Sequence, residues 1–161
     1  MQKTMLLAAA CALTACGGSS SPANHFAATM SSGNEVPASP HPNPSATGSA
    51  TYTVVDGGTA VNYTVTFSGL SGNATMGHIH VGTSSESGGV VVPFTVPAAT
   101  SGTFAGSFTA ADVRAGSTAS QTVTAGDMNS MLSAMRAKAT YTNIHTSSNP
   151  AGEIRGQNQP Q

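Results

Sequence analysis

Residues 48–68, with the sequence GSATYTVVDGGTAVNYTVTFS, contain two runs of alternating side chains separated by Asp56-Gly57-Gly58. Successive side chains of a strand point to opposite faces, so the alternation predicts strands with one buried and one solvated face. Two such runs joined by an Asp-Gly turn predict a β-hairpin. The residues expected to share the buried face of the second strand are Val61, Tyr63, Val65 and Phe67.

Short runs of the same kind continue on both sides of this hairpin, and glycine, proline and serine separate them. We therefore expect an all-β domain, either a Greek-key β-sandwich or a flattened barrel. The expected strands are residues 25–30, 48–55, 59–68, 76–81, 90–96, 103–109, 118–124, 137–144 and 152–157.

One segment has helical periodicity instead. Apolar residues stand there at i, i+3, i+4 and i+7, namely Met128, Met131, Leu132 and Met135. Asp127 is placed to cap the first turn, which predicts one short helix near residues 127–136. A methionine stripe is a soft metal site in some proteins. At helical spacing we interpret it as a core-facing stripe.

The N-terminus has the order of parts of a secretory signal: Lys3, an apolar stretch too short to span a bilayer, and Leu13-Thr14-Ala15-Cys16. This ending is similar to the bacterial lipobox, so we expect a signal peptide over residues 1–15 and lipidation of Cys16. Residues 16–24 would then form the lipidated cysteine and a flexible tether. The expected location is the cell envelope, at the outer membrane if the cell has one. The alternative is an ordinary signal peptide with an incidental cysteine.

The composition excludes several functions. The chain carries a formal net charge of −1 with few charged residues, which argues against a nucleic-acid partner. No nucleophile motif or paired-carboxylate arrangement is present, so a catalytic role is not favoured. We expect Glu153 and Arg155 to form a pair across strands or at a sheet edge.

The most chemically informative stretch is Met76-Gly77-His78-Ile79-His80-Val81-Gly82. On a strand, His78 and His80 point to the same side, about 7 Å apart, and two imidazoles at that separation converge on one ion. His145 is a third candidate, because Ile144 would take the core side of its strand. Three neutral imidazoles suit copper or zinc. His25 and His41 are weaker candidates for a fourth ligand. The alternative is that the histidine pair lies on a solvated strand and binds no metal.

Several motifs together resemble the CHRD domain, first noticed in the animal protein chordin and widespread in secreted bacterial proteins. They are residues 26–30 (FAATM), 34–37 (NEVP), 69–70 (GL), 77–82 (GHIHVG) and 149–157 (NPAGEIRGQ). The resemblance implies an extracellular, β-sandwich-like module over residues 25–157, with residues 158–161 as a C-terminal tail. The growth-factor binding of chordin does not transfer, since bacteria lack that partner.

The His-x-His strand with a later single histidine also looks like the copper ligands of copper–zinc superoxide dismutase. That family uses more histidines, a zinc aspartate and a disulfide, which this chain does not supply. Arg155 is in a position to imitate the anion-guiding arginine of that family, although edge-strand solubility explains it equally well.

Three functions remain open from the sequence. The first is a lipid-anchored, non-catalytic envelope module that binds copper or zinc through His78, His80 and His145. The second is an interaction or structural module that contacts another envelope protein without metal. The third is a copper enzyme of the dismutase type, which needs an open coordination position.

Overall fold

The computed structural model describes residues 22–39 and 42–161. The predicted signal peptide, the lipid attachment at Cys16, most of the tether and His41 lie outside the described residues. Within the described ranges, no helix has the length and apolarity needed to cross a bilayer.

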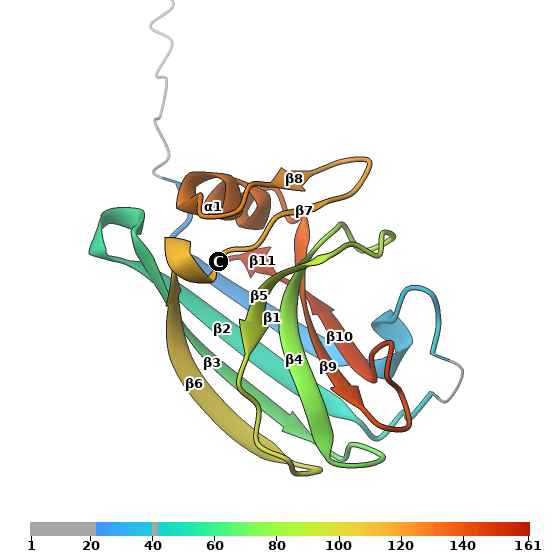
Figure 1. Ribbon diagram of the computed structural model, residues 1–161. Helices are drawn as coiled ribbons and strands as arrows, with labels where there is room; N and C mark the ends of the chain where they lie inside the picture. The colour runs from blue at the N-terminus through green and yellow to red at the C-terminus, as the bar shows by residue number, and fades with distance from the viewer. Residues whose placement is uncertain (1–21, 40–41) are drawn as a thin grey trace, which may run out of the picture.

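The chain folds into one large antiparallel sheet that curls until it is nearly closed into a barrel (Figure 1). The strand order along the sheet is β5-β4-β9-β10-β1-β2-β3-β6, and β11 also pairs with β1. The strands are β1 His25–Ser31, β2 Thr47–Val55, β3 Ala60–Ser68, β4 Ala74–Val81, β5 Val90–Phe94, β6 Gly102–Thr109, β9 Thr140–Thr146, β10 Ile154–Gln157 and β11 Gln159–Pro160. This confirms the predicted all-β class.

Aromatic rings fill the seam between the two edge strands, β5 and β6. The ring centroid of Phe94 on β5 lies 5.6 Å from that of Phe104 on β6 and 4.6 Å from that of Tyr63 on β3. Such ring pairs add about 0.5–1.5 kcal/mol beyond their area burial. The two edges are therefore joined by side chains, which helps to protect them from pairing with another chain.

The predicted hairpin is the longest ladder of the sheet, with Val55 opposite Ala60 at the turn and Thr47 opposite Ser68 at the far end. Val61, Val65 and Phe67 are buried in the core, as the alternation predicted, whereas Tyr63 on the same face is only partly buried and packs against the core. Asp56 and Gly57 have positive φ angles of 51° and 65° in the 3-10 turn Asp56–Gly58. This backbone conformation favours aspartate and glycine, which explains the turn sequence.

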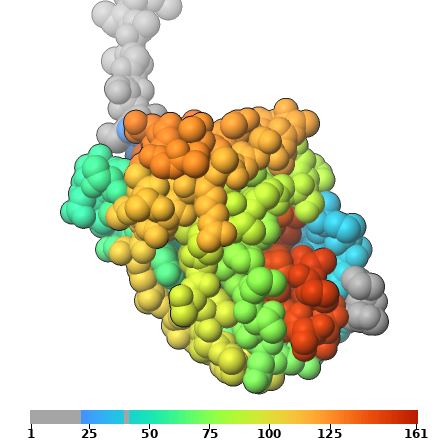
Figure 2. Space-filling view, in the orientation of Figure 1, coloured from blue at the N-terminus to red at the C-terminus, as the bar shows by residue number. Residues whose placement is uncertain are grey.

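Helix α1, Met128–Arg136, covers one end of the barrel (Figures 1 and 2). Asp127 Oδ1 accepts hydrogen bonds from the backbone nitrogens of Asn129 and Ser130, so the predicted N-cap is confirmed. The methionine stripe is buried, which confirms its packing role.

Some expected boundaries were wrong. Residues 118–124 are not one strand: a two-residue strand on each side of a turn, β7 Gly116–Ser117 and β8 Thr122–Val123, forms a separate small sheet. β9 begins at Thr140 and not near 137, because Lys138 has a left-handed φ of 58° after the helix. Residues 158–161, expected as a tail, include β11 paired with Ala27 and Phe26 of β1.

Candidate metal centre

Three histidines meet on the outer face of the sheet where β4 and β9 pair. In this ladder Met76 lies opposite His145, His78 opposite Asn143 and His80 opposite Tyr141. Directly opposed residues share a face, so one face carries all three imidazoles while Ile79 and Ile144 enter the core. The alternation that predicted the His78 and His80 pair therefore also brings in His145.

The rings are close enough to share one ion. Each of His78, His80 and His145 offers a nitrogen, and these three nitrogens lie within 4.8 Å of one another. His78 Nδ1 lies 3.2 Å from His145 Nε2. Two nitrogens bound to a tetrahedral metal at about 2.0–2.1 Å are about 3.3–3.4 Å apart, so this pair already has nearly the spacing of two ligands.

Backbone carbonyls fix the orientation of two rings. His80 Nδ1 lies 3.0 Å from the Gly88 carbonyl oxygen, and His145 Nδ1 lies 3.1 Å from that of Pro150. A carbonyl only accepts, so both Nδ1 atoms carry the proton and each Nε2 is an acceptor. The Nε2 of His145 accepts a hydrogen bond from His78 Nδ1; a metal ion bound between them would replace that proton, which His78 would then carry on Nε2. Outer contacts of this kind orient histidine ligands in metal sites.

His80 Nε2 is buried, and within the described part of the chain it has no hydrogen-bond partner. A buried polar atom without a partner costs about 1–3 kcal/mol. A metal ion shared with the other two imidazoles would satisfy it. The donor set therefore fits an imidazole-preferring ion such as copper or zinc.

All three imidazoles are held in the neutral form that metals require. Burial lowers the pKa of His78 to about 4, with the neighbouring His145, His80 and Arg114 acting in the same direction. Burial also lowers the pKa of His80 to about 4, against the bond to Gly88. His145 has a lowered pKa for the same reason, burial.

The positive charge of Arg155 is held next to Tyr141, the residue on which His80 stacks. His80 stacks on Tyr141 with ring centroids 4.9 Å apart and planes at 6°. The guanidinium carbon of Arg155 lies 3.5 Å from the centroid of the same Tyr141 ring, and Arg155 Nη2 donates to the carbonyls of Thr83 and Glu86.

The predicted pairing of Arg155 with Glu153 at an edge is wrong: both are buried, and each has its own partners.

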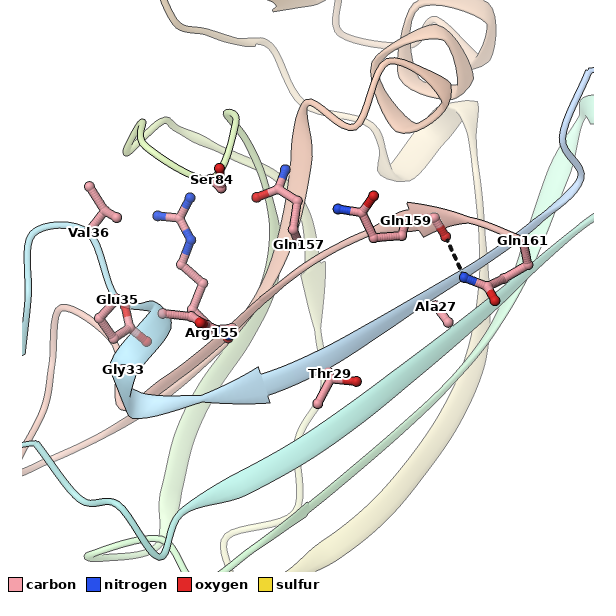
Figure 3. Close-up of a pocket in the computed structure, with 11 residues that line it drawn as sticks. Ala27, Thr29, Gly33, Glu35, Val36, Ser84, Arg155, Gln157, Gln159 and Gln161 are labelled. Atoms are coloured by element: carbon pink, nitrogen blue, oxygen red, sulfur yellow. Dashed lines mark hydrogen bonds between the residues drawn. The ribbon is translucent and has the colours of Figure 1, made fainter.

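Beside the cluster, the outer face of β1, β10 and β11 forms the floor of a cleft of about 590 Å³ (Figure 3). Its lining is mostly uncharged and polar, and includes Thr29, Ser84, Gln157 and Gln159 together with Arg155 and Glu35. Burial raises the pKa of Glu35 to about 7, against the lowering effects of a hydrogen bond from Asn143 and the charge of Arg155.

The structure brings together His78, His80 and His145 and leaves His25 out. His25 lies on β1, where its Nδ1 is 3.3 Å from Thr53 Oγ1, and its ring nitrogens do not join the cluster. Sequence reasoning missed Met76, Tyr141 and Glu35. Met76 belongs to the same alternating series as the two β4 histidines, and Glu35 stands in the NEVP motif, whereas nothing in the sequence marks Tyr141.

The lowered histidine pKa values predict a pH dependence of stability for the metal-free protein. Between about pH 6.5 and pH 4 the unfolded chain takes up protons on His78 and His80 that the folded chain does not. The contribution of these two histidines to the free energy of unfolding should therefore fall as the pH falls through this window, partly offset by Glu35, whose raised pKa acts with the opposite sign. Urea unfolding at several pH values should show a shallower fall for a His78→Gln/His80→Gln variant, and equal slopes would contradict the prediction.

Comparison with known proteins finds one matching family. The model of the CHRD domain family matches residues 26–158. This range includes all three histidines of the cluster and both strands, β4 and β9, that carry them. No curated protein and no solved structure matches the chain.

Proposed function

The chain belongs to the CHRD domain family. We propose that it is a non-catalytic binding module of the bacterial cell envelope that binds copper, or zinc, through His78, His80 and His145. One observation carries the proposal: three neutral imidazole nitrogens within 4.8 Å, two of them oriented by backbone carbonyls. The family match supports a binding module, and the imidazole set supports these metals.

The envelope location rests on the sequence. The lipobox-like Leu13-Thr14-Ala15-Cys16 and the Gly/Ser run after it support a lipid-anchored domain on a tether, outside the cytoplasm. A chain held at the membrane surface in this way would meet metal ions that enter the envelope.

Metal loading tests the proposal. The full chain should be prepared with Cys11→Ser and Cys16→Ser, because free thiolates also bind copper. After incubation with copper or zinc and removal of unbound ions, elemental analysis should give about one metal per chain. A His78→Ala/His80→Ala variant in the same background should give almost none, while His25→Ala, which changes an exposed histidine outside the cluster, should load normally. Near-zero metal in all three proteins would end the proposal.

A second candidate function is suggested by the cleft of Figure 3, which favours a module that binds a polar partner without metal. Arg155 Nη1 is buried and has no hydrogen-bond partner among residues 22–39 and 42–161. Pull-down from envelope extract separates the two functions. A partner captured equally by the wild-type chain and the histidine variant, but lost with Arg155→Lys, would favour the cleft.

A further inference from the structure

Met76 is an exposed thioether on the histidine face of the sheet. It is 44% exposed, and no other large apolar side chain of the described residues is exposed. It stands two residues before His78 on β4 and directly opposite His145 on β9. Opposed side chains on one sheet face have Cβ atoms about 4.5–5.5 Å apart, within the reach of a flexible methionine.

The exposure of Met76 has no packing explanation. Every other apolar residue of β4 from Ala74 to Val81 is buried, and a solvated strand position is usually occupied by a polar side chain. A thioether two residues before one cluster histidine and opposite another supplies a soft ligand, and thioether ligands select Cu(I).

The charge of the site points in the same direction. Within the described residues, the cluster contains no carboxylate or thiolate, so its donors are neutral. The guanidinium of Arg155 is fixed behind His80 through Tyr141, and Arg114 acts on His78 as a second positive charge. The repulsion that these cations exert is twice as large on a divalent ion as on a monovalent one. Desolvation disfavours the divalent ion still more, because its cost rises with the square of the charge.

We propose that Met76 is a fourth ligand and that the site His78, His80, His145 and Met76 selects Cu(I) over Cu(II) and Zn²⁺. The inference rests on the proposed metal-binding function and narrows it to one ion. Four occupied positions around Cu(I) leave none open for a substrate, which distinguishes a site that holds or passes on copper from a copper enzyme.

Competition for copper against chromophoric chelators tests the inference, with Cu(I) measured anaerobically in the presence of ascorbate and Cu(II) measured in air. The Met76→Leu variant, in the Cys11→Ser/Cys16→Ser background, removes the sulfur and keeps the apolar volume. We expect it to bind Cu(I) about tenfold more weakly while its Cu(II) affinity stays within about threefold of that of the parent chain. Met128→Leu, on the helix at the end of the barrel, is the matched control and should change neither affinity.

A Met76→His variant tests whether residue 76 binds the ion, because a side chain with only a structural role would not change the preference between Cu(I) and Zn²⁺. It should weaken Cu(I) binding and strengthen Zn²⁺ binding, because imidazole suits zinc and a thioether does not. Equal Cu(I) affinity in the parent chain and Met76→Leu, with binding still lost in His78→Ala/His80→Ala, overturns the role of Met76 and leaves the histidine site standing. Retention of Cu(I) by the histidine variant overturns both.

Discussion

A His145→Gln variant is expected to bind copper at least about 100-fold more weakly than the parent chain, since removal of contacts one shell further out already costs about 10–100-fold. His145 is the imidazole that β9 contributes, so without it a bound ion no longer bridges the two strands. Glutamine is close in size and polarity, so a change of affinity reports the lost ligand.

The same variant separates metal binding from folding. Copper at 100 times its dissociation constant should raise the free energy of unfolding of the parent chain by about 2.7 kcal/mol. The His145→Gln chain should gain almost nothing at that copper concentration. A His25→Gln control should respond like the parent chain, because His25 lies outside the cluster. An equal gain in all three proteins would place the ion elsewhere.

The second large effect concerns Glu153, which is fully buried in the loop just before β10. Its Oε1 accepts hydrogen bonds from the Ser71 backbone nitrogen and Asn43 Nδ2, and its Oε2 accepts from Ser71 Oγ and Thr146 Oγ1. Burial alone would raise the pKa of Glu153, but these donors outweigh it and the pKa is lowered. The carboxylate is thus charged in the folded protein and joins three segments distant in the sequence.

Replacing Glu153 by glutamine should lower the free energy of unfolding by about 2–4 kcal/mol, because an amide nitrogen then faces donors that had been satisfied. Urea unfolding at neutral pH measures the loss. Asp56→Asn, at an exposed turn position, is the control and should stay within about 0.5 kcal/mol of the parent chain. A Glu153→Gln value inside that same range would contradict the account of the loop.

Local patterns in the sequence were enough to predict the elements that depend on them. The hairpin of residues 48–68 follows from alternation and an Asp-Gly turn, and the helix follows from methionine spacing and the Asp127 cap. The orientation of His78 and His80 follows from the period of a strand. Their meeting with His145 depends on the pairing of β4 with β9, which joins segments about 60 residues apart and leaves no local signal.

The burial of Arg155 and Glu153 was not predictable from the sequence, since charged residues are almost always placed at the surface. Here the loop that carries Thr83 and Glu86 contacts Arg155, all seven residues of β9 are buried, and the two charges are matched by hydrogen bonds and a ring. The strand predicted at residues 118–124 was wrong for a different reason. The threonines there favour a strand, but of the residues in β7 and β8 only Val123 is buried, so little core packing supports a longer one.

In the proposed site the imidazoles of His78, His80 and His145 bind one copper ion. Diffraction from crystals of the copper-loaded chain, measured at the copper absorption edge, locates this ion. We predict one anomalous peak on the outer face of β4 and β9, about 2.0–2.1 Å from one nitrogen of each of the three rings. A peak elsewhere on the molecule, or no peak beside these rings, would contradict the claim.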